Sequence, residues 1–267
     1  MTAAVVGGTM LALGASTWPV AWIGLELNLL GFVPIAILTL TNKKSAITYF
    51  VVQSIGSLLL LYGGITIAAV TATCFLGVLL KIGLTPLHFW VPPVASKLSP
   101  IGLGTLLSWQ KLAPLSLLLF ISLDFTATTF INLTLGAVMI LSAACLSTLL
   151  IFRGLVQMAW VISLAGGSLM WHYLFLYYLS LWAVIWYHRR KTTPFAVALL
   201  NAGGLPPLTG FMIKLRALGS LTTPTGVLLL AGRGAALVTY VRVLLGARLR
   251  WENPPLPLLL AITLGSV

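Results

Sequence analysis

Residues 45–80 read SAITYFVVQSIGSLLLLYGGITIAAVTATCFLGVLL, a run that contains no charged side chain. A membrane-spanning helix needs only about 20 apolar residues. A straight helix of this whole run would extend roughly 54 Å at 1.5 Å per residue, well beyond the hydrocarbon thickness of about 30 Å. The run therefore predicts two helices that fold back on each other across a membrane.

The rest of the chain has the same character. Only 7% of its 267 residues are charged and 60% are hydrophobic, whereas a soluble domain carries about 25% charged residues. Four further segments contain no Asp, Glu, Lys or Arg, namely 1–25, 125–152, 154–188 and 192–213. The composition therefore predicts an all-α, polytopic membrane protein.

The net charge of +12 does not indicate a nucleic-acid partner. The basic residues are scattered, apart from the cluster Arg189, Arg190 and Lys191, and such residues fit membrane–water boundaries. The two cysteines, Cys74 and Cys145, lie in apolar segments without metal-ligand spacing, so we interpret them as packing residues. No metal or cofactor is expected in this chain.

Gly, Pro, Asn and charge clusters divide the sequence into about eleven helices that form a single transmembrane domain, 1–267. Residues 1–15 lack the basic region of a signal peptide and are predicted to be retained as the first helix. The expected helices are 3–15, 18–40, 46–68, 71–86, 101–121, 126–151, 155–170, 172–188, 193–218, 222–247 and 254–267.

The loops between these helices differ in charge. Counted along the chain, every second loop lies on one side of the membrane, and these loops hold nine basic residues, with Arg153 among them. The loops of the other side, with the adjoining helix end, hold Arg216 and Asp124. Because basic loops stay on the cytoplasmic or matrix side of a membrane, the pattern predicts an N-terminus on the positive side and a C-terminus on the opposite side.

Two segments are expected to break their helices. They are KIGLTPLHFWVPP at 81–93, which contains Pro86, and GGLPPLTG at 203–210, which contains Pro206 and Pro207. Proline removes a backbone donor and clashes with the preceding turn. Irregular backbone at membrane depth persists only inside protein or beside water, and paired broken helices indicate an ion path.

Four charges fall inside otherwise apolar helices: Glu26, Lys81, Lys111 and Lys214. Each costs about 2.5–3.5 kcal/mol at a helix centre, so we expect them to face inward, with Glu26 paired to a lysine. A buried lysine gives up its proton more readily than one in water, and arginine does not deprotonate. The set predicts a path for protons. The competing interpretation is that these charges hold helices together or reach the membrane surface.

Other candidates carry a weaker signal. His88 lies in the first broken segment, where it could relay a proton or act as an interfacial hydrogen-bond donor. Arg233, between two glycines in the segment 222–247, has no assigned role.

The residues that carry these charges also match a known family. The chain resembles subunit 2 of the NADH dehydrogenase of mitochondrial complex I, an antiporter-like, proton-pumping subunit. The matching strings, in the same order, are WIGLELN at 22–28, 47–53 with Tyr49 and Phe50, KIGLTPLHFWVP at 81–92, WQKLAP at 109–114 and GGLPPLTGFMIK at 203–214.

The resemblance implies an antiporter-like fold that lacks three N-terminal helices, with two half-paths near 18–121 and 126–247. It implies that Glu26 is the coupling glutamate and that Lys111 is the central bridging lysine. It also implies that Lys81 is the lysine on the first broken helix and Lys214 the lysine on the second. NAD, FMN, iron–sulfur clusters and ubiquinone are then expected in other subunits. The implied partners are membrane-arm subunits and phospholipids such as cardiolipin. The implied location is the mitochondrial inner membrane, with the N-terminus in the matrix and the C-terminus in the intermembrane space.

One departure concerns the bridge between the half-paths. Family members carry a histidine after the region matching Arg153, whereas residues 160–164 contain none; Ser163 and water are the expected substitutes. Two alternatives stay open: a stand-alone cation/proton antiporter subunit, and a structural membrane-arm subunit without its own channel.

Overall fold

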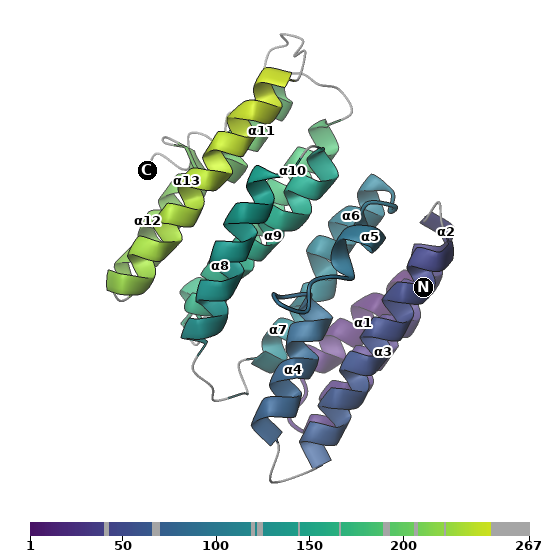
Figure 1. Cartoon of the computed structure of the whole chain (residues 1–267). Helices are drawn as coiled ribbons and strands as arrows, with labels where there is room; N and C mark the ends of the chain where they lie inside the picture. The colour runs from purple at the N-terminus through teal and green to yellow at the C-terminus, as the bar shows by residue number, and fades with distance from the viewer. Residues whose placement is uncertain are drawn as a thin grey trace. The chain divides into compact units, whose positions relative to one another are not determined.

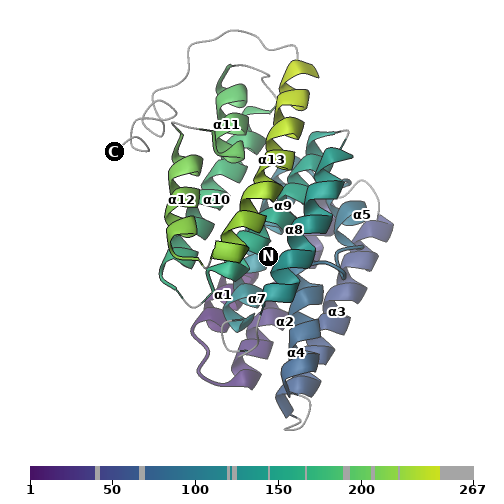
Figure 2. The ribbon, with the colours of Figure 1, turned by 60° about the vertical axis from the view of Figure 1, so that its left-hand side comes forward.

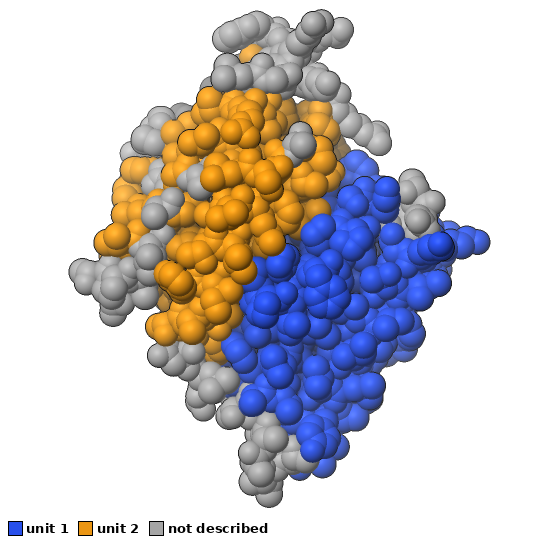
Figure 3. Space-filling view, in the orientation of Figure 1, with its two compact units in different colours: residues 1–124 blue, residues 125–267 orange. Residues whose placement is uncertain are grey.

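The computed structural model describes residues 1–39, 43–65, 70–118, 121, 125–143, 145–165, 167–188, 193–205, 208–221 and 223–246. Within these ranges the secondary structure is helical and no strand occurs, which confirms the all-α prediction. The chain divides into two compact units, Met1–Asp124 and Phe125–Val267, coloured separately in Figure 3. Each unit is described by itself below.

The first unit contains seven helices in its described residues (Figure 1). In it α2 packs on α1 and α3, α4 packs on α3, and α7 contacts α1, α2 and α4. The helices are α1 Thr2–Leu13, α2 Trp18–Thr39, α3 Lys43–Ile65, α4 Val70–Ile82, α5 Val91–Ala95, α6 Pro100–Leu107 and α7 Trp109–Leu118.

Glycines bring α1 and α2 into close, antiparallel contact. A Cβ atom added at Gly8 would lie 2.5 Å from Asn28 N and 2.7 Å from Gly24 O. A Cβ added at Gly24 would lie 2.6 Å from Ala12 N. Close backbone approach at small residues is a common way to pack helices in a membrane, so these glycines position the helix that carries Glu26.

The second unit contains six helices in its described residues (Figure 2). Here α9 packs on α8, α10 and α13, while α11 packs on α10, α12 and α13. The helices are α8 Thr126–Leu141, α9 Leu146–Ser163, α10 Leu169–Tyr187, α11 Thr193–Gly203, α12 Thr209–Gly219 and α13 Thr223–Gly246.

Four of the described helices are long and apolar enough to cross a membrane: Trp18–Leu38, Lys43–Ile65, Leu146–Ser163 and Leu169–Tyr187. Large apolar side chains such as Leu38, Phe175 and Trp186 are exposed. An exterior of this kind suits lipid rather than water, so the chain is a membrane protein.

Several predicted helix boundaries are wrong. The predicted helix 71–86 ends at Ile82, and the predicted helix 101–121 is interrupted at Ser108 into α6 and α7. The divisions at 151–155 and 170–172 are also misplaced, because α8 ends at Leu141 and α9 runs through to Ser163. The predicted helix 254–267, the basic residues 189–191, 248 and 250, and Asp124 lie outside the described residues.

Arg153 is the most important of these corrections. It was predicted in a loop, but it lies within α9 and is 2% exposed. Arg153 therefore no longer counts among the basic loop residues from which the orientation of the chain was predicted. The orientation of the termini stays a prediction.

The two predicted helix breaks are confirmed, and they have the same construction. α4 ends before Gly83 (φ 72°) and α11 ends before Gly204 (φ 78°), a left-handed conformation that favours glycine. In each break the following leucine donates back into the helix, Leu84 N–H to Leu79 O at 3.0 Å and Leu205 N–H to Leu200 O at 3.3 Å. This is the Schellman pattern. Each unit therefore presents the open carboxyl end of a helix inside the protein.

Candidate functional site

Three buried lysines define the candidate site. Lys81 and Lys111 are each 5% exposed and Lys214 is 6% exposed. Lys81 and Lys111 line one cavity of the first unit, and Lys214 lines a cavity of the second unit. All three were predicted to face inward, and their burial agrees with that expectation.

Lys81 lies in the last turn of α4 rather than mid-helix as predicted. Side chains also donate to carbonyls at this helix end: Trp90 Nε1 donates to Leu80 O at 3.0 Å, and Gln53 Nε2 donates to Lys81 O at 3.2 Å. A Cβ atom on Gly56 would lie 2.9 Å from Lys81 Cγ. Glycine at position 56 thus leaves room for the lysine side chain.

Glu26 lies in the middle of α2, as predicted, and is half-buried. Its carboxylate is close enough to Lys81 to interact with it electrostatically. The carboxylate and the ammonium group therefore belong to the same polar region of the first unit.

Lys111 lies in the first turn of α7, directly after the interruption at Ser108. Its N–H donates to Ser108 O at 3.1 Å. No proline or glycine stands at this interruption in the sequence. The break matters because it places a second lysine on the cavity that Lys81 lines.

A chain of neutral polar side chains accompanies these lysines, and the sequence reasoning did not single it out. Gln110 Nε2 donates to Asn28 Oδ1 at 3.0 Å, and Tyr49 Oη donates to Gln110 Oε1 at 3.4 Å. Tyr49 and Gln110 line the cavity of the first unit. Polar residues inside apolar helices are visible in the sequence. Which of them form hydrogen bonds with each other is not visible, because the partners are 61 and 82 residues apart.

Replacement of Gln110 by Leu is expected to leave the buried Asn28 amide without its partner. An unmet buried acceptor costs about 1–3 kcal/mol, so we expect the melting temperature of the assembled complex to fall and proton transfer to slow. The exposed Thr48 on α3 gives the control Thr48→Val. Equal melting temperatures and proton-transfer rates in the two variants would argue against a role for the Asn28–Gln110–Tyr49 chain.

The cavity of the second unit lies at the second helix break. Lys214 Nζ donates to Gly203 O at 3.4 Å, at the carboxyl end of α11. A Cβ atom on Gly204 would lie 3.2 Å from Lys214 Nζ, so the glycine also leaves room for the ammonium group. A cation is favourable at a helix carboxyl end, where partial negative charge accumulates.

Arg153 lines the same cavity as Lys214 and was missed as a site residue. Its Nη2 donates to Ser180 Oγ at 3.0 Å and to Ala202 O at 3.3 Å. Its guanidinium lies 5.3 Å from the centre of the Tyr177 ring. The only sign of this role in the sequence is that Arg153 lies in an otherwise apolar stretch. The prediction that this stretch contains a loop assigned the arginine to the membrane surface instead.

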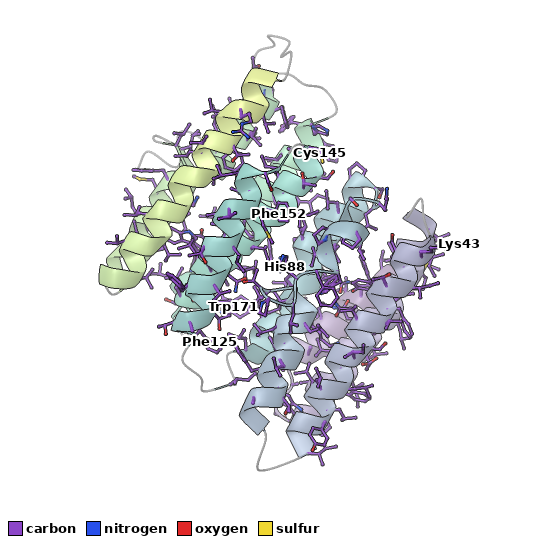
Figure 4. All side chains as sticks on the ribbon, viewed as in Figure 1. Lys43, His88, Phe125, Cys145, Phe152 and Trp171 are labelled. Carbon is purple, nitrogen blue, oxygen red and sulfur yellow. The ribbon has the colours of Figure 1, made fainter. Side chains whose placement is uncertain are left out.

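The secondary candidates lie apart from these contacts. His88 and Pro86 lie in the irregular segment between α4 and α5, where His88 is half-buried and Pro86 is exposed. Figure 4 labels His88. Ser163 ends α9, where its Oγ donates to Trp160 O at 2.8 Å. Pro206 and Pro207 lie outside the described residues. Within the described ranges, no three or more His, Cys, Asp or Glu side chains gather into a possible metal site.

Comparison with known proteins gives consistent relatives, although no protein-family profile matches. The chain is 29% identical to the NADH-ubiquinone oxidoreductase chain 2 of Lumbricus terrestris over 280 residues, which cover 90% of this chain and 83% of the relative. It is 31% identical to the protein of the same name from Dugong dugon, over 83% of this chain and 76% of the relative.

Among solved structures, the chain is similar to a chain of the Mrp complex from a Dietzia species. The TM-score is 0.81 at 16% sequence identity, and the match covers 94% of this chain and 60% of that chain. Similarity at this identity concerns the fold alone. It supports the predicted antiporter-like architecture.

Proposed function

Because the chain belongs to the family of NADH-ubiquinone oxidoreductase chain 2, we propose that it translocates protons in the membrane arm of respiratory complex I. The observation that carries the proposal is the cavity of the first unit. Two buried lysines line that cavity beside a broken helix, and Glu26 lies within electrostatic reach of one of them.

The proposed path of the first unit begins with Glu26 and Lys81. While Glu26 is ionised, its negative charge stabilises the Lys81 ammonium. When Glu26 takes up a proton, that stabilisation is lost, and Lys81 passes one N–H proton to a cavity water. The water passes a proton to the Lys111 amine. Each step moves one proton from a nitrogen or oxygen to the next, and no electron is transferred within this chain.

The proposed path continues in the second unit, with Lys214 as its exit. Lys214 lines a cavity with hydroxyl and amide groups from Tyr173, Asn201 and Thr209, which are suitable partners for water. The half-paths are proposed near residues 18–121 and 126–247, with Ser163 and water as the bridge. His88 is proposed as a secondary relay at the first helix break.

The driving force is proposed to come from other subunits. NADH oxidation and ubiquinone reduction, through FMN and iron–sulfur clusters outside this chain, would change the charge near Glu26. The proposed location is the mitochondrial inner membrane, with the N-terminus in the matrix and the C-terminus in the intermembrane space. The proposed neighbours are membrane-arm subunits and phospholipids that include cardiolipin.

A stand-alone cation/proton antiporter subunit is the second candidate, favoured by the similarity to a chain of the Mrp complex. Affinity isolation of the intact chain from mildly solubilised membranes separates the two proposals. We expect flavin- and iron–sulfur-containing subunits in equal amounts with the chain, together with NADH:quinone activity. Isolation with other antiporter subunits, and without flavin, would support the second candidate instead.

A further inference from the structure

Arg153 is a buried cation in a unit that has almost no negative side chains. It is 2% exposed, and between residues 125 and 251 the sequence contains no Asp or Glu. Arginine does not lose its proton in proteins, and an isolated charge in an apolar interior is costly. The persistence of this charge inside α9 therefore needs a reason.

Capping the broken helix does not by itself explain the arginine. Arg153 donates to Ala202 O, the second carbonyl before Gly204. In the first unit the carbonyl at the equivalent place, Lys81 O before Gly83, accepts from the neutral amide of Gln53. A glutamine thus performs the same hydrogen bonding without charge, so the positive charge of Arg153 has a separate consequence.

That consequence falls on Lys214. Ala202 O accepts from Arg153 and the next carbonyl, Gly203 O, accepts from Lys214 Nζ. Both cations line the same cavity. Two positive charges on consecutive carbonyls repel each other strongly where water is scarce, and of the two side chains only the lysine can become neutral.

The described residues of this unit, within 125–246, include no carboxylate. From α10 the titratable neighbours are Tyr173 and Tyr177, with His172 and His188 near the two ends of that helix, and from α13 the neighbour is Tyr240. Tyrosine is neutral near pH 7. Arg216 and Arg242 are exposed, and α8 and α11 carry no titratable side chain.

We propose that Arg153 is a positioning residue for proton release: its fixed charge, held on the carbonyl next to that of Lys214, makes Lys214 the group that gives up a proton. The proton leaves Nζ for a water or hydroxyl oxygen in the cavity, and Arg153 keeps its own protons. The carboxyl end of α11 attracts the protonated lysine while Arg153 opposes it, so Lys214 can both accept and release. This inference rests on the proposed function.

The test measures protons translocated per NADH oxidised in inner-membrane vesicles between about pH 6 and pH 9, a range that straddles neutrality. Arg153→Gln reproduces the neutral cap of the first unit. We expect its half-maximal pH to rise by about one unit, a tenfold tighter hold on the Lys214 proton. The control Arg242→Gln removes an exposed arginine of the same unit and is expected to keep the wild-type profile.

Two further variants keep the outcomes separate. Arg153→His carries a charge only below about pH 6.5, so we expect wild-type translocation at the acid end and Arg153→Gln behaviour at the alkaline end. A wild-type profile for every assembled Arg153 variant, while Lys214→Met lowers translocation, would overturn this inference alone. Full translocation by Lys214→Met would overturn the exit role of Lys214 in the proposed function, and this inference with it.

Discussion

Replacement of Lys111 by Met is expected to abolish most proton translocation through this chain while the complex still assembles. Methionine keeps the length of the lysine stem and suits an apolar interior. The change removes the proposed proton acceptor from the cavity that Lys81 also lines. Loss of a positioned proton-transfer group typically slows the step by about 10²–10⁴-fold.

The structure offers no described substitute for Lys111 in that cavity. The other polar side chains that line it are Tyr49, Gln53, Trp90 and Gln110. Amides and a tyrosine can hold water, but they do not store a proton near neutral pH. Lys111 and Lys81 are therefore the only described groups of this cavity that can carry a full charge.

The matched control is Lys97→Met, which changes an exposed lysine of the same unit. Both variants should assemble with normal amounts of flavin and iron–sulfur subunits. Dye-based measurement of proton translocation per NADH oxidised should then separate them. Wild-type translocation by Lys111→Met would remove Lys111 from the path and favour a structural subunit without its own channel.

Replacement of Gly8 by Val is expected to destabilise the first unit severely. The new Cβ would lie 2.5 Å from Asn28 N and 2.7 Å from Gly24 O, and backbone atoms cannot move aside as a side-chain end can. Overpacking of this kind costs about 1–3 kcal/mol or more. Separation of α1 from α2 would also displace Asn28, which accepts from Gln110.

Gly7→Val supplies the control on the same helix, because a Cβ atom at Gly7 meets nothing within 4 Å. The two variants have the same helix propensity and the same added volume. Native electrophoresis and the thermal midpoint of the assembled complex should show a loss for Gly8→Val and little change for Gly7→Val. Similar behaviour of the two variants would contradict the close packing of α1 and α2.

The membrane class and both helix breaks could be predicted from the sequence because their causes are local. A long charge-free run is stable in lipid whatever the rest of the chain does. Gly83 and Gly204 are the left-handed residues at which the two helices end. The inward placement of the lysines was predictable for a related reason. A charge that faces lipid has a high energetic cost wherever the neighbouring helices lie.

The interruption at Ser108 and the position of Arg153 were not predictable in the same way. Ser108 lacks the glycine or proline that marks the other breaks, and its effect depends on how α6 and α7 pack. Arg153 was predicted in a loop because a lone arginine between apolar runs is expensive to bury. Its stabilising partners, Ser180 and Ala202, lie 27 and 49 residues away along the chain.

The sequence alone thus determined that this is a helical membrane chain with inward lysines and two broken helices. The tertiary structure decided which of those charges share a cavity: Lys81 with Lys111 in the first unit, and Lys214 with Arg153 in the second. The physical reason is that the free-energy cost of burying a charge depends only on that residue and on the medium around it. The interactions that offset this cost depend on carbonyls, hydroxyls and rings that only folding brings to the same place.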